Sequence, residues 1–278
     1  MKSIMSENLI HPKEIIKNKE KIYKRIGNVH KGATFLFGFL TLGMIILLQD
    51  SNVIPTTSFS TGTSDPSQQL CLDNQFNPLW LMVAFVSLPA VNHGFIWYLS
   101  VYHQKMVEEF LFEKKNNPIR WIEYSVSASL MLITISILCG VSDIFLWFLL
   151  GSSNCIGMLM GQLLEMLSSP KYKDVVEKNL INYVFSLATA MVFVPWVVPL
   201  YYFFHGLAIT NADVPSFVYV ALLGIFLCFS SFGLNSFCYH ILEKYDFHTT
   251  EHIYVILSFV AKTILAVDVY GGLASVKK

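Results

Sequence analysis

Apolar segments of about 20 residues, the length that crosses the hydrocarbon core of a bilayer as a helix, recur along the whole chain. Only 14% of the residues are charged, whereas charged residues make up about a quarter of a soluble domain. The sequence therefore excludes a soluble domain and predicts an all-α membrane protein, a bundle of seven transmembrane helices. The predicted spans are residues 29–49, 78–102, 119–141, 143–167, 180–206, 215–241 and 252–274.

The connections between these spans alternate in basic residues. Those after the second, fourth and sixth spans contain Lys or Arg, whereas those after the first, third and fifth spans contain neither. Lys and Arg concentrate in the cytoplasmic connections of membrane proteins. We therefore predict that the N-terminus is cytoplasmic and the C-terminus extracellular, in an integral multi-pass protein of the plasma membrane.

The domain organisation follows from the spans. Residues 1–28 are expected to form a basic, amphipathic, cytoplasmic segment, in which a helix over residues 12–31 lies on the membrane surface and binds anionic lipid. Residues 29–274 form the seven-helix domain. Its long first external loop, residues 50–77, has a Thr and Phe content that allows a small hairpin, and residues 275–278 form a short external tail.

The last span carries a lysine, Lys262, near its middle. A lysine at that depth costs about 3 kcal/mol on insertion scales, so it needs a partner or a function. Three interpretations are open. Lys262 is a structural lysine bonded inside the bundle, part of an ion path, or the attachment point of an aldehyde through a Schiff base, since an amine in an apolar pocket is a good nucleophile.

An acidic residue in the third span is the expected partner of this lysine. Glu123 follows Arg120 by three residues and lies about one turn deeper in the span. The two side chains are therefore near enough to interact. Glu123 is therefore predicted to compensate the charge of Lys262. Ser258 precedes Lys262 by one helical turn, where its hydroxyl bonds either this site or its own backbone.

Further ionisable residues are candidates for proton transfer. His30 and His93 fall in the same cytoplasmic half, where they are either ordinary core histidines or, with Glu123, a proton-accepting cluster. Glu165 is either interfacial or a member of that cluster. Asp268, with Glu123 and His93, marks an alternative proton path.

The fifth and sixth spans supply aromatic side chains that suit a long conjugated ligand, although such residues more often serve packing. They are Trp196, Tyr201, Tyr202, Phe203, Phe226, Phe229, Phe232 and Phe237.

Other functions lack their sequence signals. The five cysteines have no paired spacing, so no metal site is expected. Motifs of common soluble enzymes are absent, and the balanced net charge names no nucleic-acid partner. We therefore expect neither an enzyme nor a nucleic-acid-binding protein.

The combination of motifs resembles a known family. Arg120-x-x-Glu123 and Ser258-x-x-x-Lys262 in a seven-helix chain resemble a microbial rhodopsin. The inverted orientation, the Glu-Tyr-Ser sequence of residues 123–125, the two histidines, Glu165 and the long first external loop resemble specifically a heliorhodopsin, from His30 onward.

The resemblance implies all-trans retinal bound to Lys262 as a protonated Schiff base, with Glu123 as counterion and with Arg120 and Ser258 as polar neighbours. It also implies a homodimer in the lipid membrane and a slow photoreceptor rather than a pump. The further residues expected around the retinal are Tyr124, Ser127, Asn154, Trp196, Phe229 and Phe232.

Two positions speak against pumping. Where outward proton pumps carry additional carboxylates, eleven residues past the counterion and four before the lysine, this chain has Thr134 and Ser258. We therefore predict a light-sensing photoreceptor that transfers a Schiff-base proton and signals to an unidentified cytoplasmic partner. The alternatives are a light-gated proton channel and, more distantly, a retinal-free transporter built on the Lys262–Glu123 pair.

Overall fold

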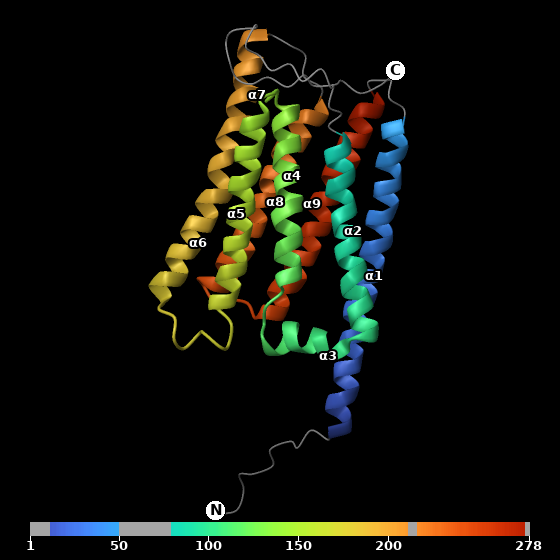
Figure 1. Ribbon diagram of the computed structural model, residues 1–278, viewed down its shortest axis with the longest axis vertical. Helices are drawn as coiled ribbons and strands as arrows, with labels where there is room; N and C mark the ends of the chain where they lie inside the picture. The colour runs from blue at the N-terminus through green and yellow to red at the C-terminus, as the bar shows by residue number, and fades with distance from the viewer. Residues whose placement is uncertain (1–11, 50–78, 211–215, 276–278) are drawn as a thin grey trace, which may run out of the picture.

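The computed structural model describes residues 12–49, 79–210 and 216–275. Seven of its segments are long and apolar enough to span a membrane, which confirms the predicted seven-helix bundle. Figure 1 shows the helices side by side along one axis. The elements are α1 (Pro12–Gln49), α2 (Leu79–Tyr102), α3 (Gln104–Val107), η2 (Glu108–Glu113), α4 (Pro118–Leu138), α5 (Ile144–Leu167), α6 (Lys178–Phe193), η3 (Val194–Trp196), α7 (Val197–Thr210), α8 (Ser216–His240) and α9 (Phe247–Ser275).

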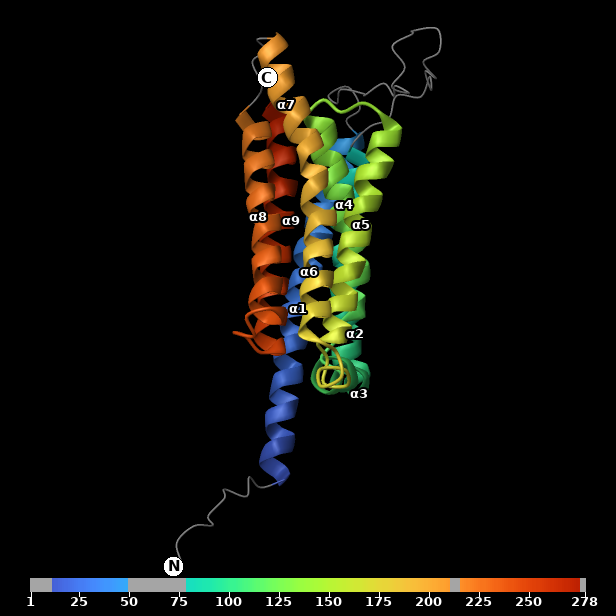
Figure 2. The same ribbon diagram turned by 90° about the vertical axis from the view of Figure 1, so that its left-hand side faces the viewer.

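Helix α4 is the central element. It packs against α2 on one side and α5 on the other, and 67% of its apolar window is buried, the largest share among the seven spans. Figures 1 and 2 show α5 and α6 on the far side of α4 from α1 and α2. The side chains of α4 therefore face the interior around most of its circumference.

Polar caps and prolines set the ends and breaks of the spans. The Asn117 side chain accepts from the backbone N–H of Arg120, and Asp143 accepts from the first N–H groups of α5. In the fifth span, Pro195 has no N–H to donate, and the helix changes to the short 3-10 turn η3 before α7 continues it. The uninterrupted fifth span predicted from the sequence is therefore broken at the level of Trp196.

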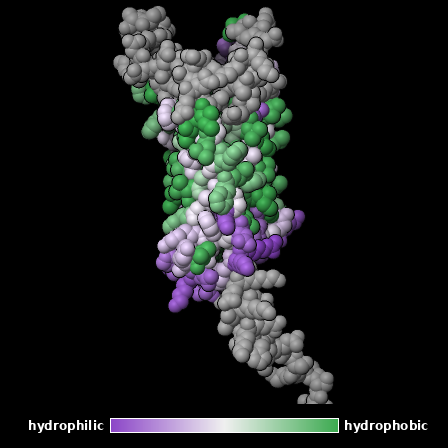
Figure 3. Space-filling view, turned by 90° about the vertical axis from the view of Figure 1, so that its right-hand side faces the viewer, coloured by the Kyte–Doolittle hydropathy of each residue, from purple (hydrophilic) through white to green (hydrophobic). Residues whose placement is uncertain are grey.

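The first helix is longer than predicted. α1 is one continuous helix that begins at Pro12, so the separate helix expected to lie on the membrane surface is absent from the structure. Figure 1 shows its N-terminal part projecting from the end of the bundle. On the face in Figure 3, apolar side chains cover the middle of the bundle and hydrophilic ones gather at that same end.

The connections between the helices differ in part from those that the sequence predicted. The connection after α2 contains α3 and the π-helical turn η2, which the sequence did not predict. Phe112 of η2 packs edge-on against Tyr23 of α1, with 5.8 Å between ring centres. The predicted loop over residues 50–77, with its hairpin, lies outside the described residues.

Candidate functional site

Lys262 and Glu123 lie together in the interior of the bundle. The Lys262 Nζ atom of α9 donates to the Glu123 Oε1 atom of α4 at 2.5 Å, and each side chain is 6% exposed. The same Nζ atom lies 5.1 Å from the centre of the Tyr124 ring. A buried ammonium is costly unless an anion compensates its charge, and Glu123 supplies that anion. The pair is a charge-compensated amine at the centre of an apolar bundle.

An apolar cavity begins at this amine. It is bounded by α4, α5, α8 and α9, and its lining residues are Tyr124, Ser127, Ala128, Met131, Met158, Phe229, Phe232, Ser258, Ala261 and Lys262. A second cavity shares Tyr124, Met158, Phe229 and Phe232 with the first, so the two adjoin. The two cavities lie side by side, one at Lys262 and the other toward α6.

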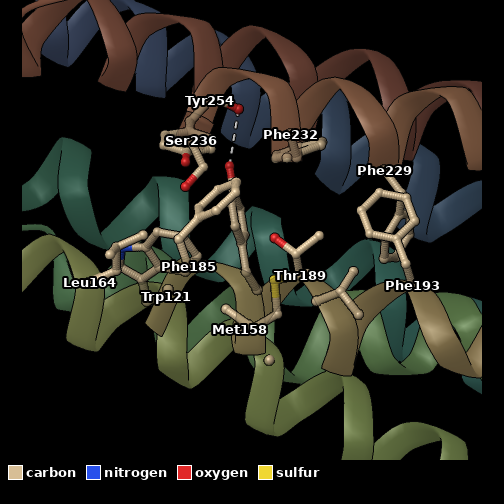
Figure 4. Close-up of a pocket in the computed structure, with 16 residues that line it drawn as sticks. Trp121, Met158, Leu164, Phe185, Thr189, Phe193, Phe229, Phe232, Ser236 and Tyr254 are labelled. Carbon is tan, nitrogen blue, oxygen red and sulfur yellow. Dashed lines mark hydrogen bonds between the residues drawn. The ribbon is translucent and has the colours of Figure 1, made fainter. Parts of the chain in front are cut away.

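Figure 4 shows the second cavity. Trp121 and Met158 line it together with Thr189 of α6 and Phe229 of α8, and the dashed line marks a hydrogen bond of 3.0 Å from the Tyr124 hydroxyl to the Tyr254 carbonyl oxygen. This bond ties α4 to α9 directly beside the cavity. Tyr124 therefore holds a fixed position between the amine and the second cavity.

Two glycines of α5 bring neighbouring helices close to the second cavity, which both of them line. A Cβ atom at Gly157 would lie 2.6 Å from the Val192 Cγ2 atom of α6, and a Cβ atom at Gly161 would overlap the Trp121 ring of α4. Larger residues at these positions would force the helices apart. The glycines therefore set the width of the cavity.

Two hydroxyl groups beside the amine are buried without a hydrogen bond. The Oγ atoms of Ser127 and Ser258 have no partner among the described residues. Neither of the two bonds considered for Ser258, to this site or to its own backbone, is formed. An unsatisfied buried hydroxyl costs about 1–3 kcal/mol, so these two groups are available to a ligand in the cavity.

Asn154 and Trp196, two other residues predicted near the ligand, lie in the core outside the cavity that holds Lys262. Asn154 is completely buried and donates to the Ser129 hydroxyl at 3.3 Å. Trp196 of η3 packs edge-on against Phe226 and Phe229, with 5.4 and 5.3 Å between ring centres. Trp196 therefore supports Phe229, which does line the cavity.

Two of the aromatic candidates point away from the bundle interior. Tyr201 is 60% exposed and Tyr202 38% exposed, and Tyr201 stacks on His205 at the surface of α7. Of the two uses left open for these aromatics, neither packing in the core nor contact with a ligand in the cavities fits Tyr201 and Tyr202. Lipid-facing and pocket-facing aromatics have the same composition in a membrane helix, so only the packing separates them.

Arg120 belongs to a separate buried network rather than to the Lys262 site. Its guanidinium forms ion pairs with Glu165 of α5 and Glu251 of α9, not with Glu123 as the sequence suggested. Glu165 also accepts from the Trp121 indole at 3.0 Å and from the Asn117 backbone N–H at 2.6 Å. Glu165 is therefore part of this network near the ends of α4, α5 and α9, and its partners in the described part of the chain do not include the histidines.

Glu251 was missed in the sequence. It precedes Lys262 by eleven residues, which is about three helical turns, so both side chains lie on the inward face of α9. The Asn117 amide donates to its Oε1 atom at 2.5 Å. The spacing from Lys262 was a usable signal, but Glu251 lies near the start of the span, where a carboxylate also suits a solvated helix end.

The two predicted histidines lie side by side. The Nδ1 atoms of His30 on α1 and His93 on α2 are 2.7 Å apart, and both side chains are buried. The Phe37 ring stacks on the His93 ring, with 5.8 Å between centres. One Nδ1 atom donates and the other accepts, so the pair can hold or pass a proton.

Asp268 lies apart from these groups, toward the other end of α9. It is partly buried, and its Oδ2 atom has no hydrogen-bond partner within the described ranges. It faces neither of the two cavities described above.

Comparison with known proteins gives one family and one fold. The family model described as Heliorhodopsin matches residues 28–274. No curated protein matches the chain. Among solved structures, the chain resembles the transmembrane domain and linker region of the Salpingoeca rosetta rhodopsin phosphodiesterase, with a TM-score of 0.64 and 12% identity over 94% of this chain and 84% of that chain. At that identity the likeness shows the fold alone.

Proposed function

The chain belongs to the heliorhodopsin family, and from this premise we propose that it is a light sensor with all-trans retinal attached to Lys262. The family and the rhodopsin-like fold support a retinal photoreceptor in general. The proposal adds the isomer, the attachment site, a slow photocycle and signalling in place of pumping.

The observation that carries the proposal is the buried pair of Lys262 and Glu123 at an apolar cavity that adjoins a second one. A long apolar aldehyde fits this arrangement, because Lys262 lines the cavity and unbonded hydroxyls lie beside it. When bound, retinal supplies absorption of visible light and isomerisation of its polyene. Ser127, Tyr124, Phe229 and Phe232 would hold it along the cavity.

The residues of the chain would manage the charge and the proton at the attachment nitrogen. Glu123 stabilises a positive charge there, because its carboxylate is close and poorly screened in the apolar interior. The His30–His93 pair would accept a proton that leaves this nitrogen, since one imidazole of the pair has a lone pair for it. Arg120, bound to Glu165 and Glu251, would hold the ends of α4, α5 and α9 together during this transfer.

A signalling role is favoured over pumping, because Thr134 and Ser258 occupy the two positions at which proton pumps carry additional carboxylates. The Thr134 hydroxyl donates to the Leu130 carbonyl oxygen at 2.8 Å, a local bond within α4. Ser258 is a neutral residue in the cavity. Neither residue can hold a negative charge that would take up and return protons. We propose that an unidentified cytoplasmic partner recognises the light-induced change instead.

Visible absorption tests the proposal. Purified protein supplied with all-trans retinal should absorb in the visible, and Lys262→Ala should lose this band while Lys31→Ala, a change at an exposed lysine of α1, should keep it. Glu123→Gln should shift the band, because it removes the nearest negative charge. A colourless parent protein would contradict the proposal and favour a retinal-free transporter.

A light-gated proton channel is a second candidate. The observation that favours it is the Oδ2 atom of Asp268, in the half of α9 beyond Lys262, which has no hydrogen-bond partner among the residues that the structure describes. Under voltage clamp, a photocurrent that reverses with the proton gradient and is lost in Asp268→Asn would support the channel. Absence of current would support the sensor.

The organisation in the membrane completes the proposal. We propose a cytoplasmic N-terminal segment of residues 1–28, a retinal-binding domain of residues 29–274 and an external tail of residues 275–278, in a chain that dimerises in the lipid bilayer. The heliorhodopsin family is not generally enzymatic, and we propose no catalytic activity for this chain.

A further inference from the structure

Helix α9 carries a third histidine at the level of the His30–His93 pair. Phe37 of α1 contacts both His93 and Phe259 of α9, at 5.8 and 6.0 Å between ring centres. Figure 1 shows that α1 and α9 run in the same direction, since both begin at the end of the bundle where the N-terminus lies. The contact between Phe37 and Phe259 therefore fixes which residues of the two helices lie at equal height.

Two turns before this contact, both helices have a histidine. His30 precedes Phe37 by seven residues, and His252 precedes Phe259 by seven residues. Seven residues are nearly two full turns, so each histidine lies on the same side of its helix as the phenylalanine above it. The spacing therefore places His252 at the height of His30, on the side of α9 that faces α1.

His252 differs from the pair in being exposed, whereas His30 and His93 are buried. His252 lies at the level of His30 and Lys31, which is close to water. The Lys31 Nζ atom lies 5.5 Å from the centre of the Trp97 ring, and Lys and Trp are typical of the membrane interface. His252 is therefore an exposed titratable group placed next to a buried proton-accepting pair.

We propose that His252 is the exit site through which a proton held by the His30–His93 pair reaches the aqueous medium. This inference rests on the proposed function, which supplies the proton from the Lys262 nitrogen. The Nδ1 atoms of His30 and His93 face each other, which leaves the Nε2 atom of His30 for a further partner. His30 gains a proton at Nδ1 and gives one from Nε2 to His252, which passes it to water and returns to its neutral form.

The charged groups around this route are few. The groups beside the route are His93 on α2 and Lys31 on α1, and the Lys31 ammonium lies over the Trp97 ring. On α9 the route meets His248, which packs on Phe112, Glu251, which is paired with Arg120, and Lys262, which is paired with Glu123. Both acids already have cationic partners, whereas His252 is an exposed group that is able to take up a proton from His30 and pass it to the medium.

Flash-induced proton release tests the inference. The parent protein, His252→Gln and His248→Gln would be loaded with all-trans retinal, and a soluble pH indicator would report protons in the medium while visible absorption reports the chromophore. His248 is the matched control, because it lies one turn earlier on α9 and packs on Phe112, at 4.7 Å between ring centres. His252→Gln should slow proton appearance about tenfold or more, and imidazole added to the medium should restore the rate.

The outcomes separate this inference from the proposed function. An unchanged visible band with slow release in His252→Gln, and parent-like release in His248→Gln, supports the exit site. Release at the parent rate in His252→Gln, equal slowing in both variants, or a coloured parent that releases no proton overturns it while the photoreceptor stands. A colourless parent protein overturns both.

Discussion

Arg120 lies between the buried carboxylate of Glu165 and the partly buried carboxylate of Glu251, and it forms ion pairs with both. Replacement of Arg120 by Gln would leave both acids without this cation. We expect it to reduce the free energy of unfolding by about 3–5 kcal/mol. Glu165→Gln should cost less, about 1–2 kcal/mol, because its amide oxygen can still accept from Trp121 and Asn117.

Thermal unfolding of the purified parent and the two variants measures this difference. The visible band reports in parallel whether the Lys262 site is intact. Equal losses in the two variants would show that Arg120 is held mainly by Glu165, and no loss in Arg120→Gln would contradict the network.

Part of the site was predictable at the scale of single residues. Lys262 and Glu123 stand out because an ionisable residue deep in an apolar span needs a partner, and the structure places them 2.5 Å apart. The partners of Arg120 were not predictable. Arg120 is three residues from Glu123, yet its side chain reaches across to α5 and α9, and sequence spacing does not show which helices adjoin.

At the scale of elements, α5 approaches α4 through Gly161, where a Cβ atom would overlap the Trp121 ring. We expect Gly161→Ala to reduce the free energy of unfolding by about 1–3 kcal/mol through overpacking. It should also perturb the visible band, because Trp121 and Gly161 both line the second cavity.

Gly38→Ala on α1 is the matched control. A Cβ atom there meets nothing within 4 Å, so this change should be neutral or stabilise the helix by up to about 1 kcal/mol. Thermal unfolding and the visible spectrum of both variants provide the measurement. Equal stability of the two would refute the close approach of α4 and α5.

The connections at the end of the bundle where the N-terminus lies are joined by an exposed ion-pair group. Hydrogen bonds from Lys173 and then Lys178 hold the pKa of Glu243 below its ordinary value. A lowered pKa in the folded state means that the stabilisation is present above the ordinary pKa and is lost as the pH falls through the folded-state value. Glu243→Gln should therefore cost at most about 1 kcal/mol at neutral pH and nothing in acid.

Thermal unfolding at neutral pH and below about pH 4, where an ordinary glutamate is protonated, checks this prediction. Glu113→Gln in η2, another exposed glutamate, is the control. If Glu243→Gln still differs from the parent protein in thermal stability in acid, the effect does not come from these ion pairs.

At the scale of the whole molecule, the alternating basic connections predict the direction of insertion. A short epitope tag at the C-terminus should be accessible to antibody on intact cells, and a tag at the N-terminus only after permeabilisation. Permeabilised cells are the control, since both tags should then be detected. The opposite labelling would reverse the proposed orientation.

The number of spans was predictable because a lipid environment demands long apolar helices, and all seven are confirmed. The arrangement of the helices was not, since lipid-facing side chains are as apolar as packed ones. The outward position of Tyr201 shows this limit. The 3-10 turn η3, in contrast, was predictable, because Pro195 has no N–H to continue the helical hydrogen bonds.

The continuous course of α1 has a mechanical consequence. From His30 to Pro12 the helix is a rod of about 27 Å, and it has no break between the proton-accepting pair and its projecting tip. A tilt of about 5° at the level of His30 would therefore move the tip by about 2 Å. The length of the rod converts a small displacement inside the membrane into a larger one where another protein can detect it.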